Sequence, residues 1–221
     1  KLIGEMGFTA TSIPEEYDGL GLGYLELCVI AEELGRSLAP TPFSSSVYLA
    51  TEFLLRLGSD EVKQNYLPKL ASGSSIGTFA HTEGNTAPTE ANITSEVKDN
   101  VINGTKIVVP DGDVADFAVV TAKEGSNIGL YIVDLKSDGV EVVSQQTLDP
   151  SRSHASLIFK DVKTITLGSL NEGWDNLQNI LDRAAVLFAF EQLGGAEASM
   201  NMAKEYAMGR FAFGRSIASF Q

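Results

Sequence analysis

The feature that most constrains the fold of this chain is a change of hydrophobic period that occurs twice along its length. Residues 1–72 and 174–208 repeat apolar side chains at helical spacing. Residues 75–165 instead contain short apolar runs about ten residues apart, separated by turn signals. Because each period buries its apolar side chains only in its own type of structure, the chain has to form a β unit between two helical ones.

The first helical segment contains two clear helix faces. Leu27, Ala31, Leu34 and Leu38 follow a spacing of four, three and four residues, which predicts a helix over 25–38. A spacing of three, four and three residues from Val47 to Leu57 likewise follows one helix face and predicts a second helix over 46–57. We expect residues 1–74 to form an N-terminal α-helical domain.

The middle segment has the texture of an antiparallel sheet. Asp-Asn, Asn-Gly and Asp-Gly pairs separate its apolar runs and favour hairpin turns. No helical pattern lies between the runs, so we expect an antiparallel sandwich or small barrel over 75–168. The expected strands are 75–82, 93–98, 105–109, 117–122, 128–135, 140–148 and 155–163.

From Trp174 the helical period returns and continues to Met208, which is long for a helix of a globular protein. We expect this helix to begin a C-terminal helical domain, 169–221, that is incomplete in this chain. The predicted fold class is therefore α+β and multidomain: an N-terminal helical domain, a middle β domain and the start of a C-terminal helical bundle.

One carboxylate on the long helix falls on its apolar stripe. A projection of 100° per residue places Glu191 on the stripe and Asp182 on its flank. A carboxylate in that position is either paired with a cation or desolvated and available for proton transfer, and the sequence leaves both readings open. The adjacent Gly194 and Gly195 weaken a helix, which indicates a close approach of another helix or of a ligand.

Composition excludes several classes of function. A formal net charge of -13 argues against nucleic-acid binding, which needs a basic surface. No apolar run approaches the roughly 18 residues of a membrane span. One cysteine and two histidines make a metal site unexpected, and a single cysteine suits a reducing, cytoplasmic location.

Several segments, in their order and spacing, resemble one protein family, the flavin-dependent acyl-CoA dehydrogenases. The segments are PEEYDGLGLGYLEL (14–27), EELGRSLAPTPF (32–43), LPKLASGSSIGTFAHTE (67–83), INGTK (102–106), LNEGW (170–174) and RFAFGRSIASFQ (210–221). Within the family, GRSLAPTPF, LDPSR (148–152) and FEQLGG (190–195) resemble the actinobacterial branch. Many members of that branch act on bulky or steroid-derived thioesters, often as paired unlike subunits.

The resemblance implies a fold, a cofactor and a reaction. The reaction would be α,β-dehydrogenation of an acyl-CoA, with FAD as the cofactor and a separate electron acceptor, in a homo- or hetero-oligomer. Thr82 matches the hydroxyl residue of the family that contacts the flavin ring. Arg210 and Phe213 match the pair that cradles the FAD of a neighbouring subunit, where arginine can bind a pyrophosphate through two hydrogen bonds.

The position of the catalytic base is left open by the resemblance. In much of the family the base lies beyond the RxxFG segment, in helices that this chain does not contain. In other branches it lies on the long helix, where Glu191 and Asp182 occupy matching segments. Glu191 is the preferred candidate because it also faces the apolar stripe.

Four positions depart from the family pattern and support the first of two alternatives. Pro88 stands where a phosphate-binding serine is expected, Val108 and Pro110 replace parts of the triplet that backs the flavin, and Ala185 replaces an arginine. One alternative is a non-enzymatic partner subunit that keeps the fold. The other is a truncated or fragmentary chain, suggested by its start at Lys1 and its end at Gln221.

Overall fold

The computed structural model describes residues 2–220, and its N-terminal part is helical as the sequence predicts. Local signals fix the starts of two helices: Glu26 accepts a hydrogen bond from the Gly23 N–H (2.8 Å), and the Ser59 hydroxyl accepts one from the Val62 N–H (3.3 Å). The helices of this part are α1 (Leu2–Glu5), α2 (Tyr24–Arg36), α3 (Glu52–Leu57) and α4 (Asp60–Ala71).

The segment before α3 differs from the α-helix predicted over 46–57. Residues Ser44–Thr51 form a π-helix that continues directly into α3. The wider turn is accompanied by a hydrogen bond from the Thr51 hydroxyl to the Ser46 carbonyl, five residues earlier (2.8 Å). π-Helical segments are frequently found at functional sites, and all eight residues of this one are buried.

The middle of the chain is a β unit, as predicted, but its sheet is mixed rather than antiparallel. The strands are β1 (Gly77–Ala80), β2 (Glu96–Lys98), β3 (Val101–Pro110), β4 (Phe117–Glu124), β5 (Asn127–Asp134), β6 (Val140–Gln145), β7 (His154–Lys163) and β8 (Ile165–Leu167). The order is β6-β7-β3-β2-β4-β5-β8, and both β1 and β2 pair with β4 in parallel. Turn signals could not predict these parallel pairs, because β1 enters the sheet from the helical layer rather than through a hairpin.

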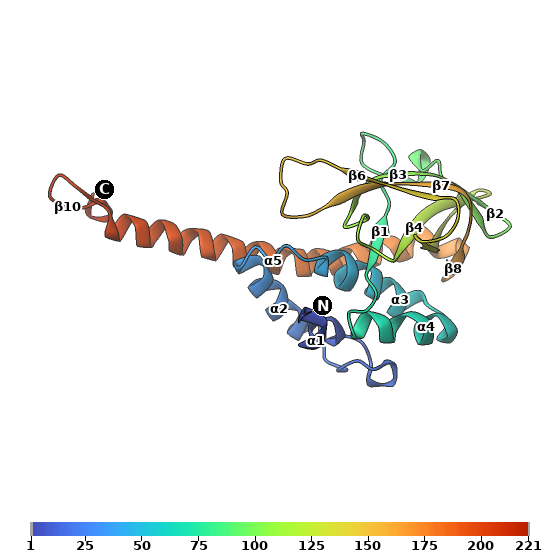
Figure 1. The fold of residues 1–221 in the computed structure, drawn as a ribbon, viewed down its shortest axis with the longest axis horizontal. Coiled ribbons are helices and arrows are strands. Elements are labelled where there is room, and N and C mark those ends of the chain that lie inside the picture. Colours follow the sequence, from blue (N-terminus) through green and yellow to red (C-terminus); the bar gives the residue numbers. More distant parts are fainter. Residues whose placement is uncertain (1, 221) are drawn as a thin grey trace.

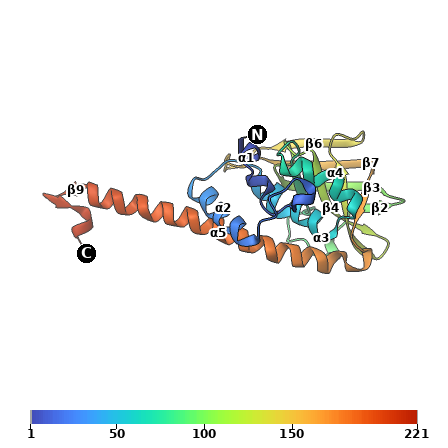
Figure 2. The same cartoon turned by 90° about the horizontal axis from the view of Figure 1, so that it is seen from below.

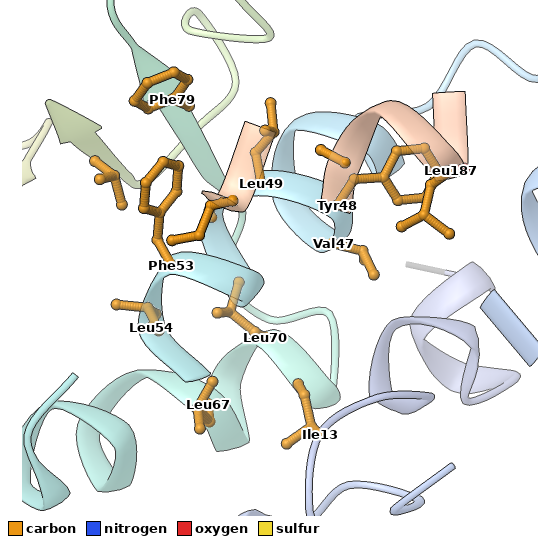
Figure 3. Packing of buried hydrophobic residues seen from close by; sticks show 14 of the residues in the cluster. Ile13, Val47, Tyr48, Leu49, Phe53, Leu54, Leu67, Leu70, Phe79 and Leu187 are labelled. Atoms are coloured by element: carbon orange, nitrogen blue, oxygen red, sulfur yellow. The ribbon is translucent and has the colours of Figure 1, made fainter. Parts of the chain in front are cut away.

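Strand β4 joins two hydrophobic cores. Its first six residues are all buried, as expected for a strand covered on both faces. Phe117 and Val119 point into a core shared with the helices, whereas Ala118 and Val120 point into a second core between strands. Figure 3 shows the helical core, in which Phe53 packs against Phe79 of β1.

Helix α5 (Gly173–Gly209) is the long helix that the sequence predicts. In Figure 1 it passes between the sheet above it and the N-terminal helices below it, and it contacts both α2 and β5. Figure 2 shows the same helix running along one side of the molecule. It crosses α2 at a very short distance, because Gly35 and Gly194 present no side chains there. A Cβ atom on Gly194 would lie 1.9 Å from the Glu32 carbonyl oxygen, and one on Gly35 would lie 1.8 Å from the Glu191 carbonyl oxygen. The glycine at 194 therefore serves the close helix contact that its position in the sequence indicates.

Beyond this crossing, α5 extends away from the rest of the molecule (Figure 1). The last residue of α5 that is buried is Gly194, and Met202 and Tyr206 further along are exposed. A short hairpin, β9 (Phe211–Ala212) and β10 (Arg215–Ser216), follows the helix. Within residues 2–220, no helix combines the length and the apolar character needed to cross a membrane.

The α2–α5 contact gives a direct test of the fold. Gly194→Ala and Gly35→Ala are each expected to lower the free energy of unfolding by about 3 kcal/mol, because the added methyl group meets backbone atoms that cannot move aside. Gly195→Ala is the matched control: its Cβ would meet an atom at an ordinary 3.4 Å, so the change should stabilise the helix by up to about 1 kcal/mol. Urea unfolding measures all three, and wild-type stability of Gly194→Ala would contradict the packing.

Candidate functional site

A cleft of about 510 Å³ opens where the helical layer, the sheet and α5 meet. The end of α2, the π-helix, the end of β3, the start of β7 and the middle of α5 all contribute to its walls. The predicted strand 140–148 ends at Gln145, and residues from the following loop line the cleft instead. Its polar lining is formed by Ser44, Ser45, Thr147, Asp149, Ser151, Arg152, His154, Glu191 and Gln192.

Glu191, the preferred base, lies in this cleft and is paired with a cation. Its carboxylate forms an ion pair with Arg152, whose other guanidinium nitrogen donates to the Ser44 hydroxyl. The Glu191 side chain is 17% exposed and that of Arg152 is 28% exposed. Of the two readings that the sequence leaves open for Glu191, the paired carboxylate is the one observed.

Two aromatic residues, Tyr48 and Phe188, pack beside this ion pair, and the charge of Glu191 affects the pKa of Tyr48. Tyr48 of the π-helix is buried and packs edge-on against Phe188, with ring centroids 5.4 Å apart. Burial and the negative charge of Glu191 raise the pKa of the Tyr48 hydroxyl far above its usual value. The Tyr48 hydroxyl therefore stays protonated beside Glu191, and it has no hydrogen-bond partner among residues 2–220.

A second carboxylate, which the sequence analysis did not single out, is buried next to the cleft. Asp111 follows β3, is 4% exposed and accepts a hydrogen bond from the Ser45 hydroxyl (2.5 Å). Burial raises its pKa in spite of that bond and of the nearby Arg152 charge. At the start of β7, the buried Nδ1 of His154 has no hydrogen-bond partner among the described residues. In the sequence Asp111 resembles an ordinary turn residue, so no local pattern marked it.

Thr82 lies just after β1, on the sheet side of the molecule. Its carbonyl accepts a hydrogen bond from the Ile107 N–H (2.8 Å). Its side chain is partly exposed, and its hydroxyl has no partner within residues 2–220. A free hydroxyl fits the predicted role of contacting a flavin ring.

The neighbours of Thr82 form a buried polar cluster. The Nδ1 of His81 shares a hydrogen bond with the Thr121 hydroxyl (2.8 Å), and the ring stacks on Phe79 with centroids 5.4 Å apart. Burial, assisted by the charge of Lys106, lowers the pKa of His81 to about 4. Burial alone would raise the pKa of Glu83, but the hydrogen bond and the charge of Lys106 outweigh it and bring the pKa to about 2.

Arg210 and Phe213 are not brought to the cleft or to Thr82. They lie on the hairpin at the far end of α5, remote from the sheet (Figure 1). Phe213 is 98% exposed, and the guanidinium of the neighbouring Arg215 stacks over Phe220 at 3.9 Å. Asp182, the second candidate base, is exposed on α5 outside the cleft lining.

Two of the positions that depart from the predicted family pattern, and Arg183 near a third, have defined local surroundings. Val108 has a φ of 52°, a strained value for a β-branched residue, and its side chain is half exposed. The Pro110 carbonyl accepts a hydrogen bond from the Thr78 hydroxyl (2.6 Å). Arg183, near the exposed Ala185, is bound to the buried Glu52 of α3 (2.5 Å). Arg183 is therefore bound to the helical layer.

Comparisons with known proteins agree with this architecture. Residues 1–74 match the family described as the acyl-CoA dehydrogenase N-terminal domain. Over its whole length the chain is 31% identical to the mitochondrial short-chain specific acyl-CoA dehydrogenase of Rattus norvegicus, of which it covers 58%. In both sequence and fold, the chain is similar to the acyl-CoA dehydrogenases along its whole length.

Two solved structures of acyl-CoA dehydrogenases show the same fold. One, from Bacillus anthracis and complexed with FAD, has a TM-score of 0.90 and 26% identity, covering 99% of this chain and 40% of that one. The other, a variant of a steroid acyl-CoA dehydrogenase, has a TM-score of 0.85 and 28% identity, covering 99% of this chain and 59% of that one. This chain spans about three fifths of the length of the curated relatives that it matches.

The depressed pKa of His81 predicts a specific loss of stability in acid. His81 is neutral in the folded protein down to about pH 4, whereas in the unfolded chain it gains a proton near 6.5. Its contribution is therefore complete above about pH 6.5 and is lost as the pH falls toward 4. Between pH 7 and 4 the wild type should lose about 3 kcal/mol more than His81→Asn, which cannot titrate. Urea unfolding at several pH values measures the difference, and parallel curves would show that His81 is not desolvated.

Proposed function

We propose that this chain carries out the FAD-dependent α,β-dehydrogenation of an acyl-CoA thioester, with Glu191 as the base. The observation that supports it most is the place of Glu191: a carboxylate held at the wall of a cleft where the π-helix, the sheet and α5 meet. The similarity to acyl-CoA dehydrogenases along the whole chain supplies the reaction class. Asp182, exposed and outside the cleft lining, is the weaker candidate.

The residues of the cleft have distinct roles in this proposal. Glu191 takes the α-proton of the acyl group, and its ion pair with Arg152 fixes the position of the carboxylate. Arg152 is itself fixed by Ser44, so the carboxylate is held at a defined point of the wall. Leu49 and Phe188 supply apolar surface for the acyl group.

The residues present fit FAD in two places. The free hydroxyl of Thr82 is available to the flavin ring, and the exposed Arg210 and Phe213 offer a cation and an aromatic face to a nucleotide. When bound, FAD would accept the hydride from the β-carbon of the acyl group. We further propose that the pair at the end of α5 serves the FAD of a neighbouring subunit, that a separate acceptor takes the electrons, and that the protein works in the cytoplasm.

A second candidate function is that of a non-enzymatic partner subunit in a hetero-oligomer. The ion pair between Glu191 and Arg152 supports this second function, because a buried carboxylate that is neutralised by an arginine can have a purely structural role. The replaced positions Pro88, Val108, Pro110 and Ala185 point the same way. Such a subunit would keep the fold and lend Arg210 and Phe213 to the FAD of another chain.

Binding of FAD by the intact protein tests the proposal. We expect the purified protein to absorb in the flavin bands and to lose that absorbance when an acyl-CoA is added without oxygen. A protein that takes up no FAD, alone or with candidate partner subunits, would contradict the proposal. A stable homo-oligomer with one FAD per subunit would instead exclude the partner-subunit role.

Substitution of Glu191 tests the role of the base. Glu191→Gln should retain FAD and acyl-CoA binding but lower kcat by about a hundredfold or more, because the amide cannot take up the α-proton. Asp182→Asn on the same helix is the matched control and should leave kcat unchanged. Stopped-flow measurement of flavin reduction gives both rates. Undiminished reduction in Glu191→Gln would assign the base to another residue.

A further inference from the structure

Lys106 of β3 is entirely enclosed, with no exposed side-chain surface. Its ammonium group donates to the Glu83 carboxylate (2.5 Å), to the His81 carbonyl (3.3 Å) and to the Thr121 hydroxyl (3.2 Å). A buried ammonium is stable only with such a complete set of acceptors. Two of the three acceptors, His81 and Glu83, are the residues immediately before and after Thr82.

Glu83 is held from its other side by the segment before β2. The N–H and the hydroxyl of Thr94 both donate to its carboxylate at 2.5 Å, and the Ser95 N–H donates at 3.1 Å. The Glu83 side chain is only 7% exposed. Glu83 therefore cannot turn away from Lys106 without leaving several donors unpaired.

A β-bulge in β3 provides the third contact. Lys106 pairs with Leu157 of β7, but Val109 pairs with Ala155, so β3 has one extra residue between them. The bulge allows the Ile107 N–H to donate to the Thr82 carbonyl (2.8 Å) instead of to β7. It also gives Val108 the positive φ described above.

His81, Thr82 and Glu83 are thus each held by a hydrogen bond from Lys106 or Ile107 of β3. We propose that Glu83, Lys106 and the Ile107 N–H, here called the β3 clamp, are positioning elements that hold the Thr82 hydroxyl ready for the flavin ring. The inference rests on the proposed function, because it assigns the purpose of the clamp to FAD. Lys106 does not touch the cofactor in this scheme and acts through Thr82.

The cost of the arrangement supports a positioning role rather than a stabilising one. A buried ion pair often contributes little or nothing to stability compared with apolar residues of the same volume. A strained Val108 adds a further cost of about 1–3 kcal/mol. Strain and buried charge kept together next to one free hydroxyl are typical of a site in which geometry matters more than stability.

Hydrogen exchange in the FAD-free protein tests the clamp itself. Lys106→Met alone leaves the Glu83 charge buried and is expected to unfold, so the informative variant is Glu83→Gln with Lys106→Met, which removes both charges at similar volume. Amides of residues 79–84 should exchange about tenfold faster in this double variant. Tyr131→Phe, which removes the hydrogen bond to Glu124 (2.8 Å) elsewhere in the sheet, is the matched control and should leave this segment unchanged. Unaltered exchange in the double variant would overturn the clamp.

Flavin binding tests what the clamp is for. The double variant should bind FAD at least about tenfold more weakly than the wild type, and its bound flavin should show a shifted absorbance spectrum, whereas Tyr131→Phe should match the wild type in both. Wild-type affinity and spectrum in the double variant would overturn the assigned purpose. A wild-type protein that binds no FAD would overturn the proposed function, and the exchange experiment would still decide whether the clamp holds Thr82.

Discussion

The crossing of α2 and α5 is the contact on which the candidate site depends. Gly35 of α2 lies directly against the backbone carbonyl of Glu191, so the contact fixes the part of α5 that carries the proposed base. An ion pair between Arg36 and Glu197 (2.6 Å) holds the two helices one turn further along. Because the helices touch backbone to backbone, the depth of Glu191 in the cleft is set by the fold and not by a flexible side chain.

The burial of β4 on both faces has a comparable role on the sheet side. Its parallel partner β1 has to lie between the helical core and the strand core, and its four residues are all buried. The direction of the chain after β1 is fixed, because residues of β3 bind His81 and Thr82 through the β3 clamp. The burial of β1 and the β3 clamp together therefore fix the point at which Thr82 reaches the surface.

The sequence was sufficient where one segment carries its own signal. The long helix, the position of Glu191 on its apolar stripe and the helix contact at Gly194 all follow from periodicity, because burial of one helix face decides them. The parallel pairs of β1 and β2, the π-helix and the ion pair between Glu191 and Arg152 join segments distant in sequence, and no local pattern encodes such contacts. For the same reason Asp111 and the β3 clamp were missed, although INGTK contains Lys106.

The geometry of α5 separates the two halves of the predicted site. Glu191 and Arg210 are 19 positions apart, and at a rise of 1.5 Å per residue a straight helix puts about 28 Å between them. The helix is continuous over that span, and the hairpin at its end points away from the sheet (Figure 2). Arg210 and Phe213 therefore cannot meet a ligand bound at Glu191 of the same chain except through a molecule of that length. If the pair at the end of α5 binds FAD, the simplest arrangement is one in which each chain lends it to the cleft of a neighbour.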